Sequence, residues 1–494
     1  MRAEAPSGRI AGLSFPAMVP WKVFAVSATG RHGNGLALAL QSARGYGRMQ
    51  RGTKPILHAI LLAALAGCGA DTQGTGEILP VSRPFVAPKG DYVTEPGRYH
   101  TFRIPGMIVA ADGSILLFAE GRRGDGSDPR RDEHAPIDLV MRRSTDQGQT
   151  WGPLVVIESG FRPDGGRLDY ADPTPVLDAT TGTVFLLYGQ WPDIAPITVA
   201  HGQAPDSNHG NHVVWVRSSS DHGKTWSDRR QVVYPDEPDE TSDGVYWRQA
   251  EPGPGSGIQL RWQDPGSDAD GRLLVPAKRS GSETPDGPVT VRPFAYYSDD
   301  HGATWHVGGV TAGPDANEDE MVELADGRIL LDARQNSGDF RRRHLSSDGG
   351  ITWGPNRPDS IPITPVDGSL IRYSATRDGH DRDRILFSGP HGGEGLDRNN
   401  ITVWTSYDEG RTFVNPVTFN HGFAAYSVLQ RLSDGTVGLV VETANEAGER
   451  YGEIRFYRIK LSSIEGPQVH SHLREGPVPQ AGRRFEPPAE RPAA

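Results

Sequence analysis

The residues of this sequence that could carry chemistry are not spaced as a metal or cofactor site. The chain has 16 histidines, but none of them forms an HExxH pattern or the paired spacing that a zinc site needs. Cys68 is the only cysteine, and the aspartates of the repeated turns do not follow the order of an EF-hand loop. We therefore expect no metal ion and no cofactor, and nothing in the sequence requires calcium.

Arginines supply the first chemical signal. Residues 99–123 read YHTFRIPGMIVAADGSILLFAEGRR. The FRIP run, the following EGRR run and the turn repeats described below together resemble bacterial sialidases, also called neuraminidases, over about residues 98–460. Sialic acid carries a carboxylate on its anomeric carbon, and the planar fork of arginine binds a carboxylate through paired charge-assisted hydrogen bonds. The resemblance implies that Arg103, Arg334 and Arg398 bind this carboxylate.

The resemblance also implies a tyrosine nucleophile. A carboxylate that attacks this carbon would be repelled by the carboxylate of the substrate, and sialidases use tyrosine as an exception among glycosidases. A phenol needs an adjacent base, because its pKa is about 10. Tyr426 matches the nucleophile and Glu318 matches its base, with Glu320 and Glu323 as competitors. If the segment is extended, Glu318 and Glu320 share a face, and Asp332 stands where the family has asparagine.

The leaving oxygen needs a proton, which the family takes from an aspartate on a loop between EGRR and the first repeat. Here the loop reads GDGSDPRRDEHAPIDLVMRRS and offers Asp125, Asp128, Asp132 and Asp138. Asp132 matches best, because mammalian cytosolic sialidases carry the same Asp-Glu-His-Ala run. Asp128 is the alternative, and Asp138 falls on the next expected strand.

Three further positions match supporting residues of the family. Glu442, at the end of GLVVE, matches the acid that holds the first arginine, and such a partner reduces the mobility of the arginine fork. Arg122 and Asp172 match positions that contact the substituents of the sugar. Residues 251–276 also resemble a sialidase segment beside the site, and we assign no chemistry to them.

A repeated turn with the consensus Ser-x-Asp-x-Gly-x-Thr-Trp/Phe indicates the β-strands that must position these residues. Asp can cap backbone amides of a hairpin turn, Gly supplies positive φ, and the aromatic residue packs between strands. The copies begin roughly fifty to eighty residues apart, about one propeller blade each. These Asp-boxes predict an all-β, six-bladed β-propeller, with the boxes on peripheral turns away from the pocket. The five copies are 144–151, 219–226, 298–305, 346–353 and 406–413.

The domain organisation follows from composition. Between residues 86 and 462, short apolar stretches alternate with Gly and Asp turns, and no change of composition marks a second domain. We expect this range to be the propeller. Residues 69–85 are small and polar and are expected to be a tether, while the Pro-rich residues 463–494 are expected to be disordered.

The N-terminal region resembles a lipoprotein signal. Residues 49–68 read MQRGTKPILHAILLAALAGC, with a basic start, an apolar core too short to span a bilayer and a lipobox-like ending. Cys68 would then carry the lipid, and the alternative is an ordinary secretory signal. A signal peptide lies at the N-terminus of a chain. We therefore expect Met49 to be the true start and residues 1–48 to result from a start codon assigned too early, with a genuine extension as the alternative. The expected location is the cell envelope, periplasmic or extracellular.

The function that the resemblance implies is an exo-α-sialidase that hydrolyses terminal sialic acid from glycoconjugates with retention. Sialylated glycans are the expected partners, together with the membrane through the lipid anchor, and we expect a monomer. The net charge of −11 argues against nucleic acid. A trans-sialidase, which passes the sugar to an acceptor other than water, and a non-catalytic glycan-binding propeller are the alternatives.

Overall fold

The computed structural model is built almost entirely of antiparallel strands. The structure describes residues 81–87, 93–129, 135–163, 165–191, 213–232, 246–282, 290–313, 316–357, 359, 361–392 and 397–465. These belong to the second of two compact units, Asp71–Ala494. Within them the helical elements are single 3₁₀ turns at Thr376–Asp378 and Leu461–Ser463, and no helix has the length and hydropathy to cross a bilayer.

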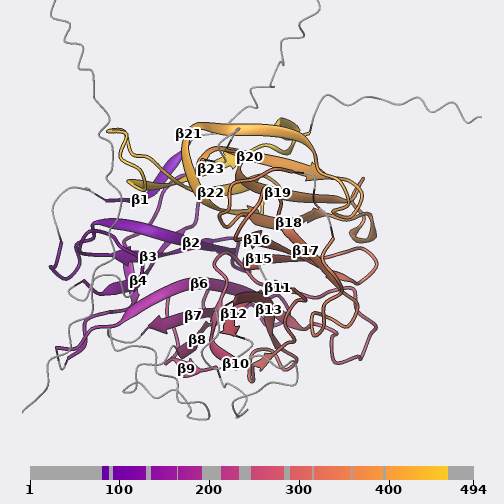
Figure 1. The fold of residues 1–494 in the computed structure, drawn as a ribbon, viewed down its shortest axis with the longest axis horizontal. Coiled ribbons are helices and arrows are strands. Elements are labelled where there is room, and N and C mark those ends of the chain that lie inside the picture. The colour runs from indigo at the N-terminus through magenta and orange to yellow at the C-terminus, as the bar shows by residue number, and fades with distance from the viewer. Residues whose placement is uncertain are drawn as a thin grey trace, which may run out of the picture. The chain divides into compact units, whose positions relative to one another are not determined.

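The strands form six antiparallel blades in chain order (Figure 1). The first three blades are built from consecutive strands, and a single parallel bridge from β4 to β6 links the first two. The first blade contains β2 (Thr101–Val109), β3 (Ile115–Arg122), β4 (Ile137–Ser144) and β5 (Val155–Glu158). The second contains β6 (Asp169–Asp178), β7 (Thr183–Trp191), β8 (Val213–Ser219) and β9 (Arg230–Gln231), and the third contains β10 (Tyr246–Pro252), β11 (Ile258–Gln259), β12 (Leu273–Ser282), β13 (Thr290–Ser298) and β14 (His306–Val307).

The last blades close the ring. The long strand β21 (Val414–Arg431) pairs with β20 through its first half and with β22 through its second half, so it belongs to two blades. The strand β1 (Ser82–Val86) completes the sixth blade by pairing with β23. The fourth blade contains β15 (Ala316–Glu323), β16 (Ile329–Gln335) and β17 (Arg342–Ser346), the fifth β18 (Ser369–Ser374), β19 (Arg384–Pro390) and β20 (Asn399–Ser406), and the sixth β22 (Val437–Thr443) and β23 (Glu453–Ile459). The predicted six-bladed β-propeller is confirmed.

The five Asp-boxes tie each of the first five blades to the blade before it, with the sixth blade preceding the first. In the first box the Ser144 hydroxyl accepts from the amide of Gly148 at 2.9 Å, and the Asp146 carboxylate accepts from the amide of Thr150 at 2.9 Å. A Cβ added to the box glycine would collide with Phe456 of the preceding sixth blade, so only glycine fits this approach. The glycines of the other boxes meet the preceding blade in the same way, at Leu116, Phe185, Leu274 and Leu330. None of the box aspartates lines the cavity described below.

The first strands of neighbouring blades lie against one another around the axis, and they are bulged where they carry candidate site residues. The strand register shifts after Arg103 in β2, after Ala171 in β6, after Ala316 in β15 and after Ala424 in β21. A β-bulge interrupts the alternation of side chains and can redirect a residue toward a site. Ile104 and Asp172 accordingly have positive φ, +54° and +53°.

Candidate active site

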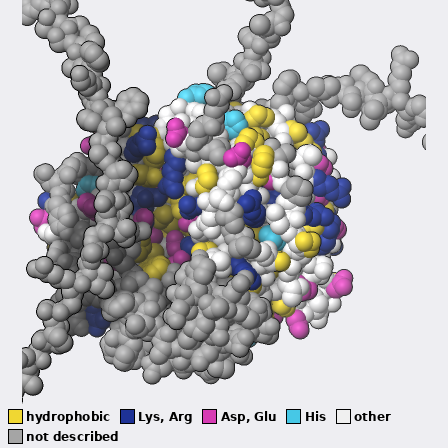
Figure 2. All heavy atoms as spheres, viewed as in Figure 1, with side chains coloured by type: hydrophobic (Ala, Val, Ile, Leu, Met, Phe, Trp, Pro, Cys, Tyr) yellow, Lys and Arg dark blue, Asp and Glu magenta, His cyan; other side chains and the backbone are white. Residues whose placement is uncertain are grey.

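The candidate site is a cavity region made of two adjoining lobes, which share the lining residues Ile104, Arg122, Asp128, Arg334 and Tyr426. The first lobe has a volume of about 540 Å³ and the second about 450 Å³. Figure 2 shows Lys and Arg side chains gathered where this face is hollowed. Four arginines, Arg103, Arg122, Arg334 and Arg398, line the first lobe. The expected carboxylate-binding residues, which lie far apart in the sequence, thus face one space.

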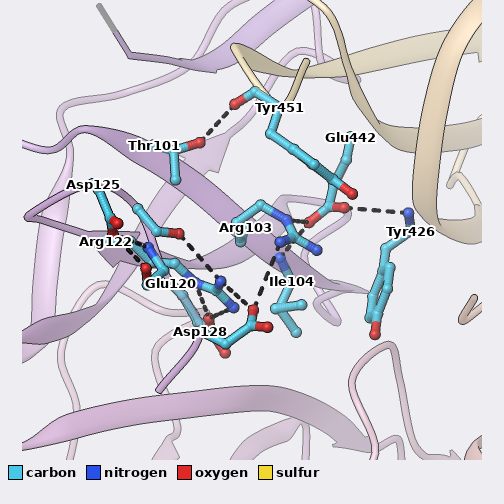
Figure 3. Close-up of polar contacts among 12 residues, drawn as sticks. Thr101, Arg103, Ile104, Glu120, Arg122, Asp125, Asp128, Tyr426, Glu442 and Tyr451 are labelled. Carbon is cyan, nitrogen blue, oxygen red and sulfur yellow. Dashed lines mark hydrogen bonds and ion pairs between the residues drawn. The ribbon is translucent and has the colours of Figure 1, made fainter. Parts of the chain in front are cut away.

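Arg103 is held by the buried carboxylate of Glu442. The Arg103 Nε donates to Glu442 Oε1 at 2.7 Å, and the amide of Ile104 donates to the same oxygen at 2.7 Å. The other oxygen of Glu442 accepts from the amide of Tyr426 at 3.3 Å. Figure 3 shows Glu442 between Arg103 and the backbone of Tyr426. One carboxylate on β22 therefore joins β2 of the first blade to β21 of the sixth.

Tyr426, Glu318 and Arg334 form a hydrogen-bonded group in which Tyr426 and Arg334 line both lobes and Glu318 lines the second. The Tyr426 hydroxyl donates to Glu318 Oε1 at 2.5 Å, and Arg334 Nη1 lies 2.6 Å from Glu318 Oε2 and 3.0 Å from Tyr426 Oη. Burial alone would raise the pKa of Glu318, but Arg334 and Lys278 outweigh it and lower this pKa below its ordinary value. Burial raises the pKa of Tyr426 well above its usual value, with Glu318 adding to the effect. The pair therefore consists of a carboxylate base and a protonated phenol.

Arg398 reaches the first lobe from the segment before β20. Its Nη1 donates to the hydroxyl of Tyr451 at 2.8 Å, and the Tyr451 ring also lies 4.1 Å from the guanidinium carbon of Arg103. Tyr451 therefore touches two of the three arginines and lines the same lobe. The sequence did not indicate Tyr451, because only its contacts in the folded structure identify it as part of the site.

Arg122 and Asp128 also line the first lobe. Arg122 is almost fully buried and pairs with Glu120 at 2.6 Å and with Asp128 at 2.6 Å. The Asp128 carboxylate is 65% exposed and also lies 3.9 Å from Arg103 (Figure 3). Asp132, the expected proton donor, lies outside the described residues, so the choice between Asp132 and Asp128 remains a prediction.

The second lobe contains Asp172 and two residues that the sequence reasoning did not single out. Lys278 Nζ lies 3.1 Å from Asp172 Oδ2 and 3.4 Å from Glu251 Oε1, and all three residues are buried. The amide of Asp172 donates to Glu120 Oε1 at 3.2 Å. A lone lysine in the apolar run GRLLVPAK was the available signal for Lys278.

The competitors of Glu318 point elsewhere. Glu320 does not line either lobe and packs so closely on Gly255 that a Cβ there would collide with its carboxyl group. The carboxylate of Glu323 accepts hydrogen bonds from the backbone amides of Arg261 and Trp262. The strand register shifts between Ala316 and Asp319, which interrupts the alternation that would have put Glu318 and Glu320 on one face.

Two other sequence expectations meet the structure at this point. Asp332, the replacement for the family asparagine, is fully buried, pairs with Arg341 and Arg343 and lines neither lobe. Cys68 lies outside the described residues. Within the ranges described above, no group of His, Cys, Asp and Glu is arranged to hold a metal ion.

Comparison with known proteins places this fold and site in a class. The BNR repeat-like domain family matches residues 113–439, so the chain is a BNR-repeat propeller. The sialidase of Micromonospora viridifaciens is 32% identical over 400 residues, which is 80% of this chain and 57% of that protein. The sialidase of Paraclostridium sordellii is 30% identical over 312 residues, covering 61% of this chain and 70% of that protein.

A solved sialidase structure is also similar to this chain. The Hadza microbial sialidase Hz136 superposes with a TM-score of 0.61 at 25% identity, covering 74% of this chain and 67% of that chain. The chain therefore belongs to the sialidase family, a family of glycoside hydrolases. It spans 57% of the length of the Micromonospora relative.

Proposed function

We propose that this protein is an exo-α-sialidase that removes terminal sialic acid from glycoproteins, glycolipids or oligosaccharides. The observation that carries the proposal is that Arg103, Arg334 and Arg398 line one lobe together with Tyr426, whose hydroxyl is hydrogen-bonded to Glu318 in the adjoining lobe. The arginines suit a sugar with a carboxylate at its reacting carbon. A neutral polysaccharide would give these arginines no partner.

The proposed reaction is a double displacement with retention. In the first step Glu318 accepts the phenol proton, a bond forms between Tyr426 Oη and the anomeric carbon, and the bond from that carbon to the leaving oxygen breaks. Asp132 gives its proton to that oxygen. In the second step Asp132 takes a proton from water, whose oxygen displaces Tyr426, and the phenol regains its proton from Glu318.

Hydrolysis of a fluorogenic sialoside by the full-length protein tests this function. The first product seen by NMR should be the α-anomer of the free sugar, as retention requires. Release of the β-anomer first would contradict the tyrosine mechanism, and transfer to added lactose would indicate a trans-sialidase. Binding of sialosides without turnover would indicate a glycan-binding propeller.

We also propose that the protein is a monomer held at the cell envelope by a lipid on Cys68. A lipid anchor gives membrane retention without a spanning helix. In cells that process lipoproteins, Cys68→Ser should move the protein from the membrane fraction to the soluble fraction. Unchanged fractionation would contradict the anchor.

A further inference from the structure

The second lobe contains charged groups that take no direct part in the bond-making and proton-transfer steps of the proposed reaction. Lys278 on β12 lies between the carboxyl groups of Asp172 on β6 and Glu251 on β10, at 3.1 and 3.4 Å. All three side chains are nine-tenths buried or nearly so, and all three line the lobe. Buried ion pairs add little net stability, because desolvation offsets their attraction. Their place on a cavity wall therefore points to ligand binding.

The two lobes differ in what they can bind. Arg103 and Arg398 line only the first lobe, Lys278 and Glu251 line only the second, and Tyr426 lies on the wall of both. A sugar that is bound by its carboxylate in the first lobe has its anomeric carbon, C2, at Tyr426. In a six-membered sugar ring C5 lies opposite C2, so the C5 substituent and its neighbours extend into the second lobe.

We propose that Asp172, Lys278 and Glu251 form a specificity subsite that selects a hydroxyl group over an acetamido group at C5 of the substrate. A hydroxyl can donate to a carboxyl oxygen and accept from the ammonium group within the same small space. An acetamido group would place a methyl against these polar groups and remove their water, which costs free energy. The apolar walls at Ala171, Trp191 and Val291 are left to pack on the ring and its carbon chain.

This inference rests on the proposed function, and a pair of substrates tests it. The substrates are 4-methylumbelliferyl glycosides of the 5-hydroxy and 5-acetamido nonulosonic acids, so the leaving group is constant. The wild-type protein should have the higher kcat/KM for the 5-hydroxy sugar. Glu251→Gln and Lys278→Met should each lower the ratio of the two kcat/KM values about tenfold, the effect of losing a hydrogen bond to a charged group, and Lys278→Arg should lower it less.

Glu409→Gln provides the matched control. Glu409 pairs with Arg372 at 2.5 Å and does not line either lobe, so its loss should not change the ratio. A preference of the wild-type protein for the 5-acetamido sugar would overturn the inference, as would an unchanged ratio in Glu251→Gln. Because Glu251→Gln leaves the pair of Lys278 and Asp172 intact, it also decides the matter if Lys278→Met does not fold. Failure to hydrolyse either sugar would instead refute the proposed function.

Discussion

The hydroxyl of Tyr426 donates to the carboxylate of Glu318 at 2.5 Å, across 108 residues of sequence and between the sixth and fourth blades. Burial makes the phenol harder to ionise, while Arg334 and Lys278 keep the glutamate charged. A weak nucleophile such as a phenol needs an adjacent base that accepts its proton. Substitutions of Glu318 and Arg334 therefore test this contact.

Glu318→Gln should lower kcat by about 10²–10⁴-fold, because the proton of Tyr426 would lose its acceptor. Glu320→Gln is the matched control. Glu320 lines neither lobe, and burial and the nearby Asp367 raise its pKa well above the ordinary value and so favour the neutral form. The amide should therefore retain activity. Steady-state kinetics on an aryl sialoside measure both variants. A large loss in Glu320→Gln with none in Glu318→Gln would reverse their roles.

Arg334→Met should move the acid limb of the pH profile of kcat/KM to higher pH. The base acts ionised, so activity falls as the pH drops through the pKa of Glu318. Arg334 is the strongest influence that lowers this pKa, and without it the pKa rises and activity is lost at a higher pH. Arg398→Met is the control, since Arg398 binds Tyr451 instead. It should raise KM without moving the limb, and equal shifts in both variants would contradict the assignment.

Glu442→Gln should lower kcat/KM about 10- to 100-fold, because Arg103 loses a charge-assisted hydrogen bond worth about 1.5–3 kcal/mol. Glu453→Gln is a matched control, since Glu453 is equally buried and pairs with an arginine at 2.5 Å, but its partner Arg83, unlike Arg103, does not line the cavity. Affinity for a carboxylate inhibitor and thermal melting should be measured together. Equal kinetic losses in both variants would mean that the effect is general destabilisation.

Phe85→Ala should destabilise the protein by about 3–5 kcal/mol through the cavity that it leaves. Phe85 lies on the closing strand β1, is 1% exposed and packs against Phe102 in a tilted arrangement, with the ring centroids 4.9 Å apart. Val86 on the same strand is 46% exposed, so Val86→Ala should change stability by less than about 0.5 kcal/mol. Denaturant unfolding compares them, and similar values would show that β1 contributes little to closure.

Asp132→Ala should reduce hydrolysis of natural sialosides far more than that of activated aryl sialosides, whose leaving groups hardly need a proton. Asp128→Ala, which removes a partner of Arg122, should affect both substrates alike. Kinetics on sialyllactose and on the aryl substrate make the comparison. Selective loss in Asp128→Ala would transfer the role of proton donor to Asp128.

The repeated boxes make the blades predictable, because each box is a local turn whose residues contact one another. The cavity residues near motifs, such as Arg103 and Tyr426, could also be assigned from the sequence. The strand bulges could not, since register depends on pairing with a distant partner. Tyr451 and Lys278 could not be assigned from the sequence for the same reason, because only their contacts with distant residues identify them. The fold brings Tyr451 beside Arg398 and Lys278 beside Asp172.

The carboxylate of Glu442 holds Arg103, which lies 339 positions earlier in the chain. This separation determines when the contact can form during synthesis of the protein. A ribosome makes Arg103 well before Glu442, so a nascent chain that lacks the sixth blade cannot hold the guanidinium of Arg103 through this carboxylate. The guanidinium is therefore fixed only after the sixth blade has docked on the first.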